Sequence, residues 1–259
     1  MTDGYTNMII AIANQKGGVA KTTSTIALGG LLAEQGSCLI VDFDPQGNLT
    51  TGLGVRIQPG QLTAYEVLTD RKQNAFGAVV ETPSGIKLLP ADISLTTGEK
   101  QILTVADNSR ILRKKLNPLR EVFNYILIDC PPSLGMLTLN ALMAADTVLI
   151  PVQCQFFALE GLRQLLETID GIRDQDTHPE LRILGVLPTM ADRTITTQDA
   201  LKTLRTKLSD IKIFEPVPKS VRFPESNLAR EPIHLYTSEK KLIQPYQAIV
   251  KLIVEQTKQ

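Results

Sequence analysis

Short runs of apolar residues alternate along the chain with longer stretches whose apolar positions recur at helical spacing. The short runs have the length of strands, and several of them are almost wholly apolar, which is typical of strands that are covered on both faces. They predict strands at residues 8–13, 38–42, 86–89, 125–129, 147–152, 183–187 and 211–217. The longer stretches predict helices at residues 22–35, 109–123, 137–145, 159–175 and 197–208.

This alternation predicts an α/β fold, in which a mostly parallel twisted sheet carries helices on both faces. No linker rich in proline, glycine or serine divides the chain, so we expect one domain over residues 1–259. Residues 55–81 have the least regular pattern and are expected to form a loop with a short helix. A last helix begins near Pro245, and a stripe of apolar residues on it favours packing against the sheet over membrane binding.

Composition limits the classes of function. Lys plus Arg and Asp plus Glu both number 27, so the net charge is zero, which excludes a uniformly basic nucleic-acid-binding protein. Tryptophan is absent and aromatics make up only 5%, so base stacking on aromatic platforms is not expected. The three cysteines and two histidines have no zinc-binding spacing. With no signal sequence or membrane span predicted, we expect a soluble, cytoplasmic protein.

A glycine-containing loop at residues 14–23 follows the first predicted strand and precedes a helix. Backbone N–H groups in such a loop, together with a helix N-terminus, favour phosphate. Lys21 would reach the β- and γ-phosphates of a nucleotide, and the Thr22 hydroxyl would ligate Mg²⁺. Other loop residues expected to contact the nucleotide are Gly17, Gly18, Val19, Ala20 and Thr23. Gln15 and Ala20 replace the two glycines of the general pattern, so this loop alone is also compatible with a Gly-Gly turn.

Aspartates follow two other predicted strands. Asp42 and Asp44 come at the end of the second strand, and Asp129 ends the fourth. The carboxyl ends of parallel strands are where ligands of this architecture bind. Asp129 fits the carboxylate that holds Mg²⁺, and either Asp44 or Asp42 fits the positioning of a water molecule. One such aspartate can equally cap a helix, but the three motifs in this order predict a nucleotide-binding site.

These motifs resemble those of the ParA/MinD ATPases, whose deviant Walker A loop carries an additional lysine at its start, here Lys16. The resemblance covers nearly the whole chain and is greatest to short Soj-type ParA proteins. Ala20 departs from the glycine that the family usually has there. Longer members carry an N-terminal helix-turn-helix domain, which we do not expect here because only seven residues precede the first predicted strand. The matching segments are KGGVAKTT at 16–23, DFDPQGN at 42–48, DCPPS at 129–133, LTLNAL at 137–142, PVQ at 151–153, ALEG at 158–161 and PKSVR at 218–222.

The resemblance implies a homodimer that encloses two ATP molecules, each with Mg²⁺. Lys16 would reach the phosphates bound by the partner and, with Lys21, stabilise charge on the transferring phosphoryl group. Asp44 would orient the attacking water, and Asp129 would lie in the metal shell. Thr189 and Pro218 would lie near the adenine.

The resemblance also implies DNA binding that requires ATP, has no sequence preference and brings the protein to the nucleoid. Because the net charge is zero, basic patches would have to be pooled across a dimer. A ParB-like protein or cargo adaptor would stimulate weak hydrolysis, and the cargo would be a plasmid, a chromosome origin or a protein body such as a carboxysome. Candidate DNA contacts are Arg193, Lys219, Arg222, Arg230, Lys240 and Lys241.

Two other classes of function remain open. One is a MinD-like membrane-associated spatial regulator, although the polar tail at residues 255–259 lacks the expected basic amphipathic extension. The other is a metabolic or redox enzyme of the same fold, such as a nitrogenase iron protein or an amidating synthetase.

Overall fold

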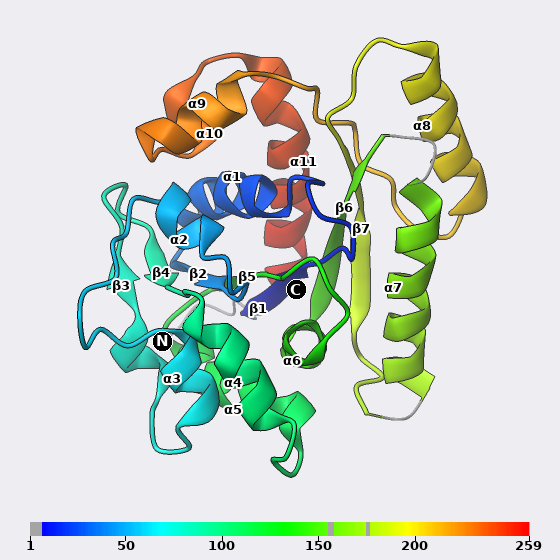
Figure 1. The fold of residues 1–259 in the computed structure, drawn as a ribbon. Coiled ribbons are helices and arrows are strands. Elements are labelled where there is room, and N and C mark those ends of the chain that lie inside the picture. Colours follow the sequence, from blue (N-terminus) through cyan, green and yellow to red (C-terminus); the bar gives the residue numbers. More distant parts are fainter. Residues whose placement is uncertain (1–6, 155–157, 175–176, 259) are drawn as a thin grey trace.

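A computed structural model of the protein describes residues 7–154, 158–174 and 177–258. Its centre is one seven-stranded sheet with the order β3-β4-β2-β5-β1-β6-β7 (Figure 1). Neighbouring strands pair in parallel except β3 and β4, which are antiparallel. The predicted mostly parallel α/β sheet is therefore confirmed. The strands are β1 (Met8–Ile12), β2 (Cys38–Asp42), β3 (Val80–Glu81), β4 (Lys87–Leu89), β5 (Tyr125–Asp129), β6 (Thr147–Gln153) and β7 (Arg182–Thr189).

Helices cover both faces of the sheet. Helices α1 and α11 pack on one face, and α3 to α8 contribute to the core on the other (Figure 1). Three short 3₁₀ helices add to these, at Ala75–Ala78, Asn108–Arg110 and Asn117–Glu121. The α-helices are α1 (Lys21–Ala33), α2 (Asn48–Gly52), α3 (Ala64–Thr69), α4 (Ser94–Ile102), α5 (Ile111–Leu116), α6 (Met136–Ala144), α7 (Ala158–Asp174), α8 (Ile195–Lys207), α9 (Arg222–Ala229), α10 (Ile233–Tyr236) and α11 (Lys240–Thr257).

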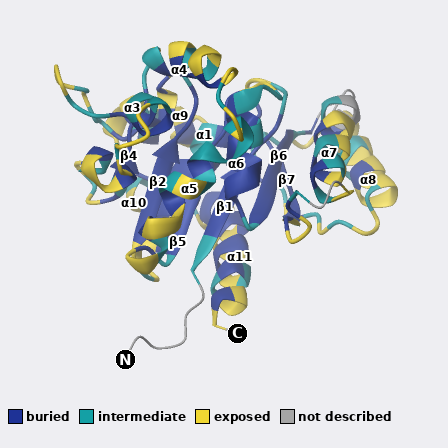
Figure 2. Ribbon diagram, turned by 90° about the horizontal axis from the view of Figure 1, so that it is seen from below, coloured by how far each residue is buried: buried dark blue, intermediate teal, exposed yellow. Residues whose placement is uncertain are grey.

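The central strand β1 explains why the predicted strands are almost wholly apolar. Ile9 and Ala11 belong to the core under one helical layer, whereas Ile10 and Ile12 belong to the core under the other. Successive side chains of a strand point to opposite faces, so a sheet covered on both sides needs apolar residues at every position. Figure 2 shows the strands buried and the exposed residues concentrated on the outer faces of the helices.

The predicted strand at 211–217 is wrong. This segment contributes only an isolated bridge, from Ile213 to Val186, and a second bridge joins Pro218, just after the segment, to Ala191. Proline has no N–H to donate to a strand ladder, and Pro216 and Pro218 both fall at this edge of the sheet.

The predicted helix at 109–123 is divided. It consists of the turn Asn108–Arg110, helix α5 and the turn Asn117–Glu121, with a proline in the first turn of the last of these. Pro118 has no N–H to donate, so the α-helical hydrogen bonding of α5 cannot continue through it, and the chain goes on as a 3₁₀ turn.

The C-terminal helix is longer than predicted. It begins at Lys240 and contains Pro245. Residue 175, at the end of another predicted helix, lies outside the described residues. Among residues 7–154, 158–174 and 177–258, no helix has the length and apolar character needed to cross a bilayer.

Candidate functional site

The carboxyl ends of three adjacent parallel strands meet near the centre of the sheet. In the strand register, Asp129 of β5 lies beside Ile12 of β1 on one side and Asp42 of β2 on the other. The loop after β1 therefore starts beside two of the aspartates that the sequence singles out. The structure brings the three predicted motifs together at one edge.

The start of the loop is held by Asn14, a residue that the sequence analysis did not single out. Its buried side chain donates from Nδ2 to the carbonyl of Pro151 at 2.7 Å and accepts the N–H of Lys16 at 2.9 Å. Beyond it, Gly17 and Gly18 are exposed. Gly18 has a φ of +70°, and no atom lies within 4 Å of the place where a Cβ would stand. A phosphate can therefore approach this part of the backbone closely.

Ala20 marks the point where the loop becomes helix α1. Its backbone has φ 64° and ψ 33°, a left-handed conformation that glycine adopts more easily than alanine. The sequence shows that a glycine is missing here but does not indicate this conformation. The loop thus keeps the backbone path of a glycine while carrying a methyl group.

Lys21 begins helix α1 and is 7% exposed. Its Nζ donates to the carbonyl of Lys16 at 3.2 Å. Burial lowers the pKa of Lys21, and the carboxylates of Asp129 and Asp44 oppose that shift. A partly desolvated ammonium group at the end of a glycine loop interacts strongly with a phosphate. The proposed reach of the Lys16 side chain to a second subunit stays a prediction.

Thr22 and Asp129, the two predicted metal ligands, are in direct contact. The Thr22 hydroxyl donates to Asp129 at 2.6 Å, and the Thr25 hydroxyl donates to the same carboxylate at 3.3 Å. Burial and the nearby charge of Asp42 raise the pKa of Asp129 to about 8, although the hydrogen bond from Thr22 and the charge of Lys21 oppose that shift. Hydroxyl and carboxylate oxygens are ligands that Mg²⁺ prefers, so the donor set fits this cation.

The structure distinguishes Asp42 from Asp44. Asp42 is fully buried and accepts the N–H and hydroxyl of Thr50 at 2.8 and 2.6 Å. Burial raises the pKa of Asp42 to about 7. Asp44 is 7% exposed and accepts the N–H of Gln46 at 3.0 Å. The carboxylate of Asp42 is thus occupied by its hydrogen bonds to Thr50 in helix α2. Asp44 is therefore the better candidate for orienting water.

The fit of a nucleotide is supported by a further polar group beside the loop. The Oε1 atom of Gln15 is buried and has no hydrogen-bond partner among the described residues. Buried polar atoms normally have partners, so an unpaired acceptor next to a phosphate loop is consistent with a ligand there. Three carboxylates and one ammonium also gather at this edge, and Mg²⁺ would balance their charge.

The two residues expected near the adenine occupy different environments. Thr189 is fully buried, and its hydroxyl donates to the carbonyl of Val19 at 3.1 Å. It therefore supports the phosphate loop instead of presenting a free hydroxyl to a base. Pro218 is partly exposed and bridges to Ala191, two residues after Thr189. An adenine contact at Pro218 stays a prediction.

The candidate DNA contacts do not form one continuous set of unpaired cations. Arg222 is bound to Glu225 at 2.9 Å and to Glu239 at 3.2 Å, and these carboxylates raise its pKa. The expectation that Arg222 is available to phosphate is therefore not supported in this conformation. Arg193, Lys219 and Arg230 are exposed, and within the described residues no hydrogen bond or ion pair holds their side chains. Lys241 contacts Glu239 at 3.2 Å, and Lys240 begins helix α11.

Three residues that hydrogen-bond to the loop or to the aspartates were not predicted from the sequence. Asn14 and Thr25 lie within or near the loop, and their polar side chains between apolar neighbours are a signal that could have been used. Thr50 lies eight residues after Asp42 and also accepts the N–H of Ala91 at 3.0 Å. No local pattern indicates that contact, because it depends on how helix α2 folds back.

Comparison with known proteins shows what the chain is similar to. The AAA_31 family model, described as an AAA domain, matches residues 7–183. The chromosome partitioning protein ParA of Caulobacter vibrioides is 41% identical over 95% of this chain and 93% of its own length. The sporulation initiation inhibitor protein Soj of Bacillus subtilis is 39% identical over 94% of this chain and 96% of its own.

Solved structures agree with these relatives. A Cyanothece McdA–ATP complex has a TM-score of 0.90 at 26% identity and covers 97% of this chain and 98% of that one. A structure titled cobyrinic acid a,c-diamide synthase, from Mycobacterium smegmatis with a bound ATP analogue and magnesium, has a TM-score of 0.82 at 36% identity, covering 95% and 93%. The fold, the order of the motifs and these likenesses lead to one conclusion: the chain belongs to the ParA/MinD family of ATPases.

Proposed function

We propose that this chain is a ParA-type ATPase that binds ATP and Mg²⁺, dimerises when ATP is bound and positions or segregates a cargo by binding DNA without sequence preference. The observation that carries the proposal is the contact between Thr22 and Asp129 beneath the loop that holds Lys21. A phosphate loop, a Mg²⁺ hydroxyl ligand and an acidic residue in the metal shell are the parts that phosphoryl transfer requires.

The loop would bind the phosphates through groups that already face the site. Backbone N–H groups around Gly18 and the N-terminus of α1 favour negative charge. The Lys21 ammonium would exchange the Lys16 carbonyl for phosphate oxygens, which interact with it more strongly. Mg²⁺, when bound, supplies charge neutralisation at the transferring phosphoryl group. Thr22 and Asp129 would hold it, and Asp129 would then be ionised because a nearby cation favours the carboxylate.

Asp44 and Lys16 would complete catalysis. Asp44 would orient the attacking water, because it is partly accessible whereas Asp42 is buried under Thr50. Lys16 would act across the dimer, since a cation supplied by a partner subunit stabilises charge that develops in the transition state. A stimulating partner, ParB-like or a cargo adaptor, would control the rate of hydrolysis.

The names of the relatives support a partitioning or positioning role. The Caulobacter relative is named for chromosome partitioning, and McdA is a structural neighbour. The proposed cargo is a plasmid, a chromosome origin or a protein body such as a carboxysome. Arg193, Lys219 and Arg230 would contact DNA phosphates, and two subunits joined by ATP would double their number.

Fluorescence anisotropy on two unrelated DNA duplexes, with and without Mg²⁺-ATP and across a salt series, tests this function. We expect binding only with ATP, similar affinities for both duplexes and a steep loss with salt. Arg230→Ala should lower the salt slope by about one per subunit, whereas Lys258→Ala at the end of the chain should leave it unchanged. Equal binding without nucleotide would contradict the proposal. ATP-dependent sedimentation with anionic liposomes in place of DNA binding would favour the MinD-like alternative.

An amidating enzyme is the second candidate, because the Mycobacterium smegmatis neighbour is titled a cobyrinic acid a,c-diamide synthase. The cysteines of this chain do not support nucleophilic catalysis. Burial raises the pKa of Cys38 to about 12 and that of Cys154 to about 11, and it also raises the pKa of Cys130. Reactive thiols have lowered pKa values instead. ATP turnover that requires cobyrinic acid would favour the synthase, and turnover without it would favour the partitioning ATPase.

A further inference from the structure

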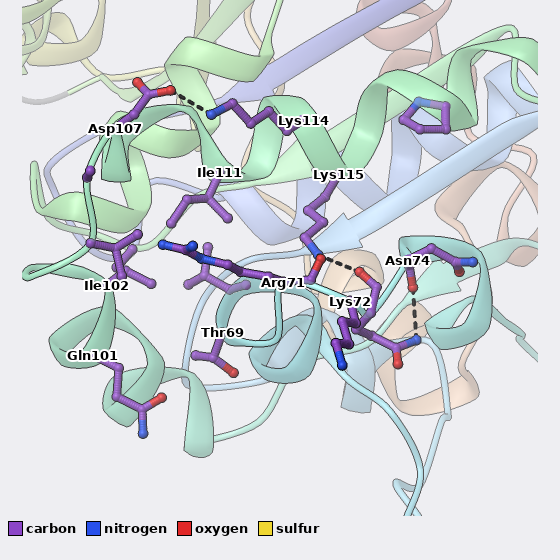
Figure 3. Close-up of a pocket in the computed structure, with 15 residues that line it drawn as sticks. Thr69, Arg71, Lys72, Asn74, Gln101, Ile102, Asp107, Ile111, Lys114 and Lys115 are labelled. Carbon is purple, nitrogen blue, oxygen red and sulfur yellow. Dashed lines mark hydrogen bonds and ion pairs between the residues drawn. The ribbon is translucent and has the colours of Figure 1, made fainter.

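A pocket of about 660 Å³ lies among α3, the segment 71–74 that follows it, α4 and α5 (Figure 3). Its lining falls between Leu68 and Pro118, so it includes none of the phosphate-loop residues and none of the strand-end aspartates. A volume of this size is typical of sites for small organic ligands. The proposed ATPase function makes no use of it.

The pocket is more positively charged than the chain as a whole. Arg71, Lys72, Lys114 and Lys115 line it, with Asp107 as the one carboxylate among the lining residues, while the chain has no net charge. This excess indicates an anionic ligand.

Two of these four cations already have partners. Lys114 pairs with Asp107 at 2.7 Å. Lys115 donates to the backbone carbonyls of Asp70 at 2.7 Å and Arg71 at 3.1 Å, and also to that of Gln73, so its three N–H groups are used. The site therefore offers few free donors.

Arg71 and Lys72 differ from the other two cations. Within the described residues, neither side chain has a hydrogen-bond or ion-pair partner. Figure 3 shows the Arg71 side chain reaching across the pocket toward Ile102 and Ile111, whereas Lys72 points away from them. Arg71 is thus the free cation that lies over the interior of the pocket.

The floor beneath Arg71 is apolar. Leu68 and Ile102 are buried, and Val105 and Ile111 are half-buried at the pocket wall. Leu103, next to this wall, is 57% exposed. An aliphatic chain placed on this surface would leave water and would cover the exposed parts of Val105 and Ile111, while Leu68 and Ile102 would contact it from below.

We infer that this pocket binds a carboxylate carried on an aliphatic chain, with the carboxylate on Arg71 and the chain on Leu68, Ile102 and Ile111. The planar guanidinium matches a carboxylate in a bidentate geometry. A phosphate would need more hydrogen-bond donors than the pocket has free, because Lys114 is paired with Asp107 and Lys115 donates to backbone carbonyls. The ligand has two possible sources, a free fatty acid or an acidic side chain flanked by leucines in a partner peptide.

The test uses ¹H–¹⁵N NMR titration of the full chain with sodium hexanoate and, as its uncharged match, 1-hexanol. We expect hexanoate to shift signals of residues 68–74 and 101–111 with a Kd on the order of a few millimolar, since small ligands gain only modest free energy per atom. Hexanol should bind at least about tenfold more weakly, because it has no charge to pair with Arg71.

Variants separate the parts of the inference. Arg71→Gln should weaken hexanoate at least about tenfold and leave hexanol unchanged. Lys72→Gln, the same charge change on the adjacent residue, should have little effect. Ala106→Phe, at an exposed position of the lining, should fill the pocket and abolish binding of both probes, while circular dichroism shows that the fold is kept.

The source is decided by two further probes. Tighter binding of decanoate than of hexanoate, with no binding of acetyl-Leu-Glu-Leu-amide, indicates a fatty acid. Tighter binding of the peptide, lost when its Glu is replaced by Gln, indicates a protein partner. Equal affinities for hexanoate and hexanol, equal losses in Arg71→Gln and Lys72→Gln, or no shifts in the pocket would overturn the inference.

Discussion

Replacing Ala20 by glycine should stabilise the nucleotide-free protein. Ala20 holds φ 64°, and a left-handed backbone disfavours a residue with a Cβ by roughly 1–2 kcal/mol. Glycine removes that strain but gives the unfolded chain more freedom, which costs about 0.4–1 kcal/mol. The free energy of unfolding should therefore rise by about 1 kcal/mol, a shift in Tm of roughly 2–4 °C for a chain of this size.

Ala248→Gly is the matched control. Ala248 is an exposed residue within helix α11, where its backbone is right-handed. The same substitution there should lower the free energy of unfolding by about 1 kcal/mol, because glycine disfavours a helix interior. Urea denaturation of both variants without nucleotide measures the two changes. Opposite signs support the strained loop, and a loss of stability in Ala20→Gly equal to that in Ala248→Gly would refute it.

Four further predictions concern the site. Lys21→Ala should weaken ATP by on the order of 1.5–3 kcal/mol in titration calorimetry, because a desolvated charge-assisted contact is lost, and near-wild-type affinity would contradict the phosphate-loop assignment. Asp44→Ala should keep ATP affinity and accumulate dimer in size-exclusion chromatography, whereas Asp42→Ala should mainly lower Tm because Thr50 loses its acceptor. Lys16→Ala should bind ATP but hydrolyse it poorly, and full activity would exclude the crossing lysine. The raised pKa of Asp129, about 8, means that the folded protein holds more protons than the unfolded chain between about pH 4 and 8, so this group's contribution to stability is lost as pH rises through that range. Asp129→Asn should therefore gain stability relative to wild type between pH 5 and pH 8 in urea denaturation, and a constant difference would contradict the shift.

The bounds predicted from the sequence are most accurate for strands whose apolar pattern matches their burial in the structure. Strands β2 and β5 have the predicted bounds, because every residue in them is buried between two helical layers and is accordingly apolar up to the final aspartate. The segment at 211–217 alternates apolar residues with Lys212 and Glu215, contains Pro216 and lies at the edge of the sheet beyond β7. Periodicity reports burial, and burial alone does not distinguish a paired strand from an extended segment that only packs against one.

The site was predicted through residues that are close in sequence to a strand end. Lys21, Thr22 and Asp129 belong to this group. The pairing of β1 with β5 brings them together, so their strand-end positions are enough to predict the contact. The choice between Asp42 and Asp44 could not be made in this way. It depends on Thr50, which approaches Asp42 only after α2 has folded, and on the difference in burial that results.

The site holds two unfavourable features, and a bound nucleotide with Mg²⁺ would relieve only one of them. The left-handed backbone of Ala20 is set by the path of the loop, so a bound phosphate that uses the same path would leave its strain unchanged. The buried carboxylates are different, because burial raises the pKa of Asp129 and of Asp42 and a cation would lower both. Mg²⁺ with ATP should therefore reduce the stability gained by Asp129→Asn while leaving the gain from Ala20→Gly unchanged. If nucleotide removed the effect of Ala20→Gly instead, the loop would have to change its backbone path on binding, and Thr189, which holds Val19, would be the contact to break.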